Sequence, residues 1–272
     1  MPQNIFCKKL PSPRGLDRAA FTIVGAEISP VLQDAANRYL DLIFPSTLPP
    51  SSTTTYTLTL AVTDPTAILK AGVDESHSLD VAADSTTINA ATVYGAMHAL
   101  ETFSQLVGGV YTTSSPALKV TCSITDRPRF PHRGLMIDSA RNFLPEADIL
   151  TTIDGLSYNK MNVLHWHLSD SQSFPFVSQT YPEMSKAGAY EPSMTYPPDS
   201  VARIVSHALA RGVRVIPEFD VPGHAYAGYD AIPGNLTVCG NHQPWTDTCV
   251  EPPCGQLDIT HPGAAKVYDG LL

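Results

Sequence analysis

The 272-residue sequence has no cluster of lysine and arginine and no long apolar run. Its 17 basic and 26 acidic side chains give a formal charge of −9, which argues against nucleic acid or an anionic membrane surface as a partner. No apolar run approaches the roughly 20 residues of a membrane-spanning helix. The N-terminal stretch MPQNIFCKKLPSPRG lacks the apolar region of a signal peptide. A neutral or basic small ligand suits this chain better than a polyanion.

The five cysteines include no Cys-x2-Cys pair of the kind that binds zinc. Cys239, Cys249 and Cys254 lie in one Pro/Gly-rich stretch, and we predict a disulfide within that loop. An odd total leaves one thiol unpaired, or its partner outside this chain. The loop disulfide and the glycosylation sequon Asn235-Leu236-Thr237 together indicate an oxidising compartment.

Hydrophobic periodicity predicts a small α+β layer over residues 21–107, in which Ser29 caps the first helix. The other elements predicted there are strands at 56–62 and 77–83 and a helix at 91–107. A linker rich in turn residues follows, and its end, TDRPRFPHRG (125–134), contains proline breaks that mark a boundary. We therefore predict one domain over 1–125 and a second over 126–272.

From Arg133 onward, strands alternate with helices, which indicates a parallel sheet. The predicted elements are strands at 133–139, 161–170 and 213–220, helices at 144–159, 199–212 and from 260, and a long loop at 171–198. In a closed (β/α)8 barrel or an open doubly wound sheet, the site lies beyond the C-terminal ends of the strands. A whole barrel takes roughly 250 residues and only about 140 remain, so a barrel here would be incomplete.

Each predicted strand of this second domain ends in side chains capable of acid–base chemistry. Asp138 follows the first strand, Asp170 the second, and Glu218 and Asp220 the third, with His224 shortly afterwards. Asp170, Glu218 and Asp220 are candidates for the carboxylate pair of a glycoside hydrolase. Strand-end carboxylates also bind backbone amides, so the spacing leaves both roles open.

Three interpretations remain open for His165 and His167, which the alternation of a strand places on one face. In the first, they join Asp170 and His224 in a zinc site. In the second, they are hydrogen-bonded core residues beside a packed Trp166. In the third, Asp170 instead pairs with His224 and fixes the tautomer of its ring.

Arg133 has two interpretations, because it precedes its strand instead of following it. It is either an ion pair at the domain boundary or a guanidinium that reaches ligand hydroxyls. Asp138 and Arg141 suggest a structural pair in a loop. Trp166 and Trp245 either stack on sugar faces or pack in the core.

Three stretches, read in order, resemble glycoside hydrolase family 20, the β-N-acetylhexosaminidases. They are RFPHRGLMIDSARNFLP, IDGLSYNKMNVLHWHLSDSQSFPF and ARGVRVIPEFDVPGH. The stretch ESHSLDVAADSTTINAATVYGAMHALETFSQLV is similar to the small α+β domain of that family. The resemblance runs from about residue 20 to the end of the chain.

This resemblance implies an α/β fold in which a small α+β N-terminal domain precedes the first part, about three βα units, of a TIM (β/α)8 barrel. The implied substrates are glycans or chitin oligosaccharides that end in β-linked N-acetylglucosamine or N-acetylgalactosamine. The implied mechanism is substrate-assisted, since the 2-acetamido oxygen of the sugar attacks its own anomeric carbon. The resemblance implies no metal or other cofactor, a secreted or lysosomal/vacuolar location, and a homodimer for the full-length protein.

The resemblance also implies roles for individual residues. Arg133 matches an arginine that binds the sugar hydroxyls, and Asp170 and His224 match a supporting aspartate–histidine pair. Glu218 and Asp220 match the acidic end of the third barrel strand.

The family's catalytic aspartate–glutamate dipeptide, expected after a fourth barrel strand, has no counterpart here. The one Asp-Glu dipeptide, Asp74-Glu75, precedes a strand of the N-terminal domain. We therefore predict an N-terminal portion of a hexosaminidase that is inactive alone. The alternatives are a non-catalytic fragment that binds amino sugars or pairs with a subunit, and a metal-dependent hydrolase that uses His165, His167 and His224.

Overall fold

The computed structural model describes residues 4–45, 55–108 and 116–271, which fall into two compact units. Unit 1 comprises Met1–Arg133, Ser157–Lys160 and Leu209–Gly212, and unit 2 comprises Gly134–Leu156, Met161–Ala208 and Val213–Leu272. The predicted domain boundary between residues 125 and 126 stays a prediction.

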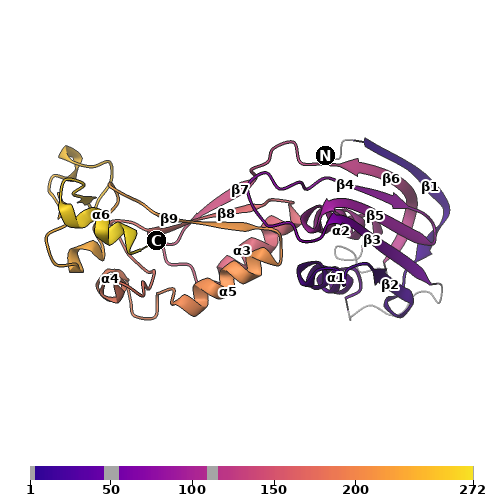
Figure 1. Cartoon of the computed structure of the whole chain (residues 1–272), viewed down its shortest axis with the longest axis horizontal. Helices are drawn as coiled ribbons and strands as arrows, with labels where there is room; N and C mark the ends of the chain where they lie inside the picture. The colour runs from indigo at the N-terminus through magenta and orange to yellow at the C-terminus, as the bar shows by residue number, and fades with distance from the viewer. Residues whose placement is uncertain (1–3, 46–54, 109–115, 272) are drawn as a thin grey trace. The chain divides into compact units, whose positions relative to one another are not determined.

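Unit 1 is built on a six-stranded sheet with the strand order β1-β6-β4-β5-β3-β2 (Figure 1). Its strands are β1 (Asn4–Gly15), β2 (Phe21–Val24), β3 (Tyr56–Asp64), β4 (His77–Val81), β5 (Ser85–Thr92) and β6 (Ala117–Asp126), and its helices are α1 (Pro30–Ile43) and α2 (Val93–Val107). The pairs β2–β3 and β3–β5 are parallel, and the other three pairs are antiparallel.

The two helices of unit 1 cover one face of this sheet, and the core lies between them (Figure 1). On β3, the buried side chains of Tyr56, Leu58 and Leu60 alternate with half-exposed Thr57 and Thr59. This alternation confirms the predicted strand, since only one face of the sheet is packed. Helix α1 begins after Ser29 as predicted, but Ser29 makes no side-chain capping bond. The helix buries a stripe of residues: Leu32, Ala35, Ala36, Tyr39 and Ile43.

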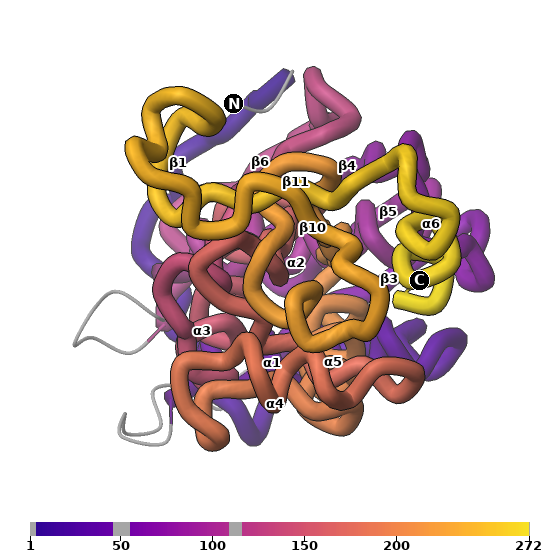
Figure 2. Tube along the Cα trace, turned by 90° about the vertical axis from the view of Figure 1, so that its left-hand side faces the viewer, coloured from indigo at the N-terminus to yellow at the C-terminus, as the bar shows by residue number. Residues whose placement is uncertain are grey.

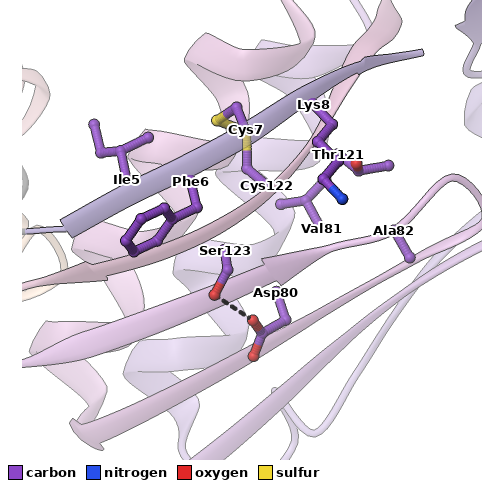
Figure 3. A pocket seen from close by; sticks show the side chains of 10 residues that line it. All are labelled: Ile5, Phe6, Cys7, Lys8, Asp80, Val81, Ala82, Thr121, Cys122 and Ser123. Carbon is purple, nitrogen blue, oxygen red and sulfur yellow. Dashed lines mark hydrogen bonds between the residues drawn. A yellow bond between two sulfur atoms is a disulfide. The ribbon is translucent and has the colours of Figure 1, made fainter.

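Four strands of unit 1 were absent from the sequence-based prediction: β1, β2, β5 and β6. Strand β6 occupies part of the predicted linker, of which residues 109–115 lie outside the described residues. Strand β1 contains Pro11 and Pro13, and a strand that pairs on one side tolerates prolines that would break a central strand. Cys7 on β1 lies opposite Cys122 on β6, and a disulfide joins them (Figure 3).

Unit 2 contains a parallel sheet with the order β7-β8-β9, and every predicted strand of this region is confirmed. Its elements are β7 (Gly134–Asp138), α3 (Glu146–Tyr158), β8 (Val163–Ser169), α4 (Pro182–Gly188), α5 (Pro198–Leu209), β9 (Arg214–Phe219), β10 (Thr237–Val238), β11 (Gln256–Leu257) and α6 (Pro262–Asp269). The predicted loop at 171–198 instead contains α4 and a bridge between Phe176 and Tyr196. Strands β10 and β11 run antiparallel, side by side (Figure 2).

The core of unit 2 lies between the parallel sheet and its helices. Trp166 on β8 is buried and stands edge-on to Tyr196, with 4.9 Å between ring centroids. Ile149 and Ile153 of α3 and Ile204 of α5 belong to the same core cluster. Because the three strands are parallel, their C-terminal ends lie along one edge of the sheet. Within the described ranges, no helix is both long and apolar enough to cross a bilayer.

Candidate active site

The C-terminal ends of β7, β8 and β9 bring three polar side chains into one row. Asp138 on β7 is in register with His167 on β8, and His167 is in register with Glu218 on β9. The strand ends leave the core at this level, so polar groups are tolerated there.

His167 bridges two carboxylates and is itself buried. Its Nδ1 lies 3.1 Å from Oε2 of Glu218, and its Nε2 lies 2.9 Å from Oδ2 of Asp170. Burial opposes the charged imidazolium, but the two carboxylates outweigh burial and raise the pKa of His167 from its ordinary 6.5 to about 9. At neutral pH this ring is therefore a cation that ties β8 to the end of β9.

Asp170 is the buried centre of the site. One of its oxygens accepts the Ser171 N–H at 2.6 Å and lies 3.1 Å from Nδ1 of His224, while the other lies 3.2 Å from Nη2 of Arg141. Burial would raise the pKa of Asp170, but the bond to His167 and the other donors outweigh burial and lower it. The structure thus brings Asp170 and His224 together, as predicted.

Arg141 lies among carboxylates in the loop after β7. Its Nη1 is 2.7 Å from Oδ2 of Asp138, and its Nη2 is 2.6 Å from Oε1 of Glu251. Burial would lower the pKa of Arg141, but these two carboxylates outweigh burial and raise it. The Arg141 side chain remains 32% exposed.

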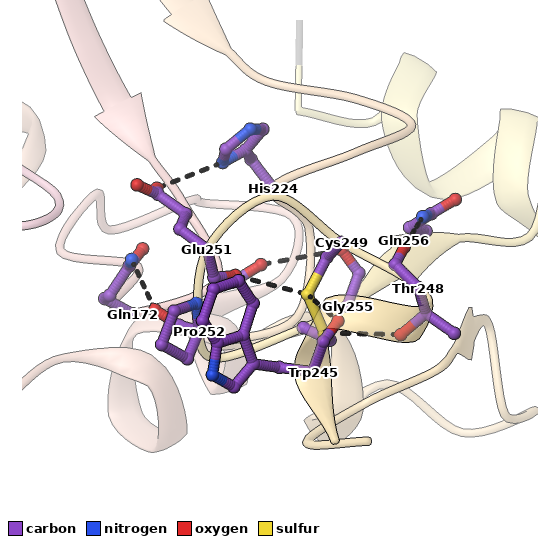
Figure 4. Close-up of a disulfide and its surroundings, with 11 residues drawn as sticks. Gln172, His224, Trp245, Thr248, Cys249, Glu251, Pro252, Gly255 and Gln256 are labelled. Carbon is purple, nitrogen blue, oxygen red and sulfur yellow. Dashed lines mark hydrogen bonds and ion pairs between the residues drawn. A yellow bond between two sulfur atoms is a disulfide. The ribbon is translucent and has the colours of Figure 1, made fainter. Parts of the chain in front are cut away.

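Glu251 reaches Arg141 from the predicted disulfide loop, which is confirmed as a bond between Cys249 and Cys254 (Figure 4). Its Oε1 also lies 3.7 Å from Nδ1 of His224. Glu251 was not among the site residues predicted from the sequence. No local pattern signals this residue, because Arg141 lies 110 residues earlier in the chain. Cys239 is exposed and unpaired.

Arg133 lies just before β7, at the opposite end of that strand from the cluster. Its Nη2 is 2.9 Å from Oε2 of Glu75, and its Nε and Nη1 donate to the carbonyls of Lys160 and Phe130. Glu75 is 4% exposed and also lies 3.2 Å from Nε2 of His98. Arg133 therefore makes an ion pair, which was one of the two interpretations of this residue from the sequence. Its predicted contact with sugar hydroxyls is not tested by these contacts and stays a prediction.

Glu218 and Asp220 flank the site at the end of β9. Oε2 of Glu218 lies 2.6 Å from Nε2 of His165, so both histidines of the motif HWH contact one carboxylate. Burial and the nearby negative charge of Glu218 raise the pKa of Asp220. A carboxyl group with a raised pKa beside an ionised one is suited to holding a proton.

Two groups of side chains have the spacing of metal ligands: His167 with Glu218 and Asp220, and Asp170 with His224 and Glu251. Neither group fits a metal well. Both ring nitrogens of His167 face carboxylates, and a protonated imidazole has no lone pair for a metal. In the second group, the guanidinium of Arg141 already supplies the positive charge.

The two tryptophans differ in accessibility. Trp166 is buried and donates from Nε1 to Oγ of Ser139 at 2.9 Å, so it is a core residue. Trp245 is partly exposed and lies beside the disulfide loop, since its carbonyl accepts the N–H of Cys249 (Figure 4). Stacking of Trp245 on a sugar stays a prediction.

The chain belongs to glycosyl hydrolase family 20. The model of the family's catalytic domain matches residues 130–272, and a beta-acetyl hexosaminidase-like model matches residues 9–106. The predicted fold class, a small N-terminal sheet domain followed by the first part of a TIM-type barrel, is confirmed by this match and by the solved structures below.

The similar proteins are hexosaminidases. The chain is 42% identical over 239 residues to beta-hexosaminidase subunit A1 of Dictyostelium discoideum, covering 87% of this chain and 43% of that protein. It is 43% identical over 206 residues to a chitooligosaccharidolytic beta-N-acetylglucosaminidase of Bombyx mori, covering 73% of this chain and 33% of that protein. The chitobiase structure from Flavobacterium johnsoniae superposes with a TM-score of 0.77 at 28% identity, covering 99% of this chain and 41% of that one. The chain thus spans less than half the length of these relatives.

Proposed function

We propose that this chain supplies one wall of the active site of a β-N-acetylhexosaminidase, which removes terminal N-acetylglucosamine or N-acetylgalactosamine from glycans or chitin oligosaccharides. The observation that carries the proposal is the cluster of Arg141, Asp170 and His224 beyond the ends of three parallel strands, in a chain of family 20. The relatives with chitooligosaccharidolytic and hexosaminidase names support the class of substrate.

Arg141 takes the sugar-binding role that the sequence analysis gave to Arg133. Its side chain is one-third exposed, and its permanently charged guanidinium is held in place by Asp138 and Glu251. Nε and Nη2 already face Glu251 and Asp170, so a guanidinium fixed in this way can still donate from Nη1 to a sugar hydroxyl at little entropic cost. Asp170 is wholly buried, so it supports Arg141 and His224 and does not itself face the sugar.

The reaction is retaining and substrate-assisted. The acetamido oxygen of the substrate attacks the anomeric carbon and forms an oxazolinium ion, while a glutamic acid protonates the leaving oxygen. An adjacent aspartate orients the acetamide and stabilises its developing charge. These two carboxyl groups come from outside the 272 residues, because Glu75 of the one Asp-Glu dipeptide is buried against Arg133 and His98.

Hydrolysis of 4-nitrophenyl N-acetyl-β-glucosaminide tests the proposal. We expect turnover by a longer polypeptide that includes the Asp-Glu dipeptide, and none by the 272-residue chain. The matched control substrate is 4-nitrophenyl β-glucoside, which lacks the acetamide and should not be cleaved. Equal cleavage of both substrates, or turnover by the 272-residue chain at the rate of the longer one, would contradict it.

A second candidate, a subunit-pairing fragment, is favoured by apolar side chains on the sheet of unit 2. Leu135, Met136 and Ile216 are 44%, 52% and 37% exposed. Exposed apolar strands favour association with a partner. Light scattering of the purified chain over a tenfold concentration range tests this candidate, and a monomer throughout would exclude it. The homodimer and the secreted or lysosomal/vacuolar location stay predictions, and the two disulfides support the latter.

A further inference from the structure

Asn235 lies in an exposed turn of unit 2, between the 3-10 helix Tyr229–Ala231 and β10. Its backbone has φ of 53°, in the left-handed region, which asparagine adopts more readily than most residues. Pro233 and Gly234 before it are also exposed. The side chain of Asn235 therefore has open surroundings on the solvent side of the turn.

The residues that follow Asn235 hold this turn in place. Leu236 is 2% exposed, and its carbonyl accepts the N–H of Asp258 at 2.8 Å. Thr237 is half-buried and pairs with Leu257 across β10 and β11. The turn is thus fixed by a buried leucine and a two-stranded ladder while its asparagine stays accessible, so a bulky group on Asn235 would not disturb packing.

Asn235-Leu236-Thr237 is the one Asn-x-Ser/Thr sequence, with x other than proline, among the 272 residues. The structure contains two disulfides, one of which joins strands across 115 residues of sequence. Disulfides of this kind form in oxidising compartments, and in eukaryotic cells the secretory pathway that forms them also glycosylates such sequons. Relatives from Dictyostelium discoideum and Bombyx mori are eukaryotic proteins.

We propose that Asn235 carries an N-linked glycan. In this reaction the side-chain nitrogen of Asn235 forms a bond to C1 of the first N-acetylglucosamine of a lipid-linked oligosaccharide. The bond from C1 to the lipid diphosphate breaks, and the amide loses a proton. The hydroxyl of Thr237 is the part of the acceptor that makes the sequon recognisable.

The glycan stands beside exposed apolar side chains of the same loop region. Val238 is 43% exposed, and Ile259 is 75% exposed and follows Asp258, whose N–H bonds the residue after Asn235. A bulky hydrophilic glycan on this loop region lowers the tendency of exposed apolar side chains near it to associate.

Intact mass spectrometry of the protein, expressed in eukaryotic cells behind an added secretion signal, tests the proposal. We expect the mass to exceed the sequence mass by one glycan, and treatment with peptide N-glycosidase to remove the excess and convert residue 235 to aspartate. Asn235→Gln and Thr237→Ala should both abolish the excess, whereas Thr237→Ser should keep it, because serine preserves the sequon.

Asn241→Gln is the matched control, since Asn241 is also exposed with φ of 54° but is followed by His242 and Gln243. This variant should keep the glycan. Secreted wild-type protein at the unmodified sequence mass would overturn the proposal, as would a glycan that survives Thr237→Ala. The result is independent of hydrolase activity, so the two proposals can fail separately.

Discussion

The bridge that His167 makes between Asp170 and Glu218 predicts that unit 2 loses stability at alkaline pH. The folded-state pKa of His167 is about 9 and its ordinary value is 6.5, so folding raises this pKa. A histidine whose pKa is higher in the folded state contributes its full stability at pH values below its unfolded-state pKa. This contribution is lost as the pH rises through the folded-state pKa. The relevant window is therefore between pH 6.5 and about pH 9.

The size of the effect follows from the shift. A difference of about 2.5 pKa units at about 1.4 kcal/mol each gives roughly 3 kcal/mol between pH 6 and pH 9.5. The side chain is 5% exposed, so little of this energy is screened by solvent. A loss of this size is a large part of the stability of an ordinary domain, which is roughly 5–15 kcal/mol.

Urea unfolding followed by tryptophan fluorescence measures the effect in unit 2 alone, because both tryptophans, Trp166 and Trp245, belong to that unit. The wild-type free energy of unfolding should fall by about 3 kcal/mol more than that of His167→Gln over this pH window. His242→Gln, which removes an exposed histidine, should behave as the wild type. Equal pH dependence in His167→Gln and the wild type would refute the charged bridge.

The remaining predictions concern three other side chains. Burial lowers the pKa of His77 from 6.5 to about 4, so the free energy of unfolding of unit 1 should fall by roughly 3 kcal/mol between pH 6.5 and pH 4. Urea unfolding followed by circular dichroism should show a smaller fall in His77→Gln. An equal fall in the variant and the wild type would contradict this. Asp170→Asn in the longer polypeptide should lower kcat at least tenfold, because the amide cannot balance the charge of Arg141 while it also contacts His224. A wild-type rate on the chromogenic substrate would count against that support. Glu251→Gln should raise KM severalfold with a smaller change in kcat, because Arg141 loses one of its charged anchors; an unchanged KM would show that the anchor is dispensable.

Prediction from the sequence worked best where one hydrophobic periodicity continues through a long stretch. The apolar stripe of α1 and the alternation of β3 are confirmed, because burial on one face leaves a strong pattern. The three parallel strands of unit 2 are also confirmed, and they were predicted from short apolar runs that alternate with helices. Strands β1 and β6 left a weak pattern. Strand β1 is almost wholly exposed, so its register depends on pairing with β6 and on the disulfide between Cys7 and Cys122, which are 115 residues apart.

The candidate site was predicted in part, for a similar reason. Strand ends located Asp170 and His224, since parallel strands bring their ends together. Glu251 joins the site from a loop 110 residues after Arg141, and no local pattern encodes that contact. The sugar-binding role of Arg133 was inferred from a motif match alone, which gives no side-chain contacts. Only the structure shows that Arg133 forms an ion pair with Glu75, whereas Arg141 forms one with Asp170.

The most direct test of the account compares two arginine variants in the longer polypeptide. We expect Arg141→Ala to lower kcat/KM for 4-nitrophenyl N-acetyl-β-glucosaminide by roughly 100-fold or more, because it removes a charged donor from the sugar. Arg133→Lys, which keeps the charge beside Glu75, should leave kcat/KM within about twofold of wild type. A folded Arg141→Ala enzyme with wild-type kcat/KM, alongside a large loss in Arg133→Lys, would contradict the account.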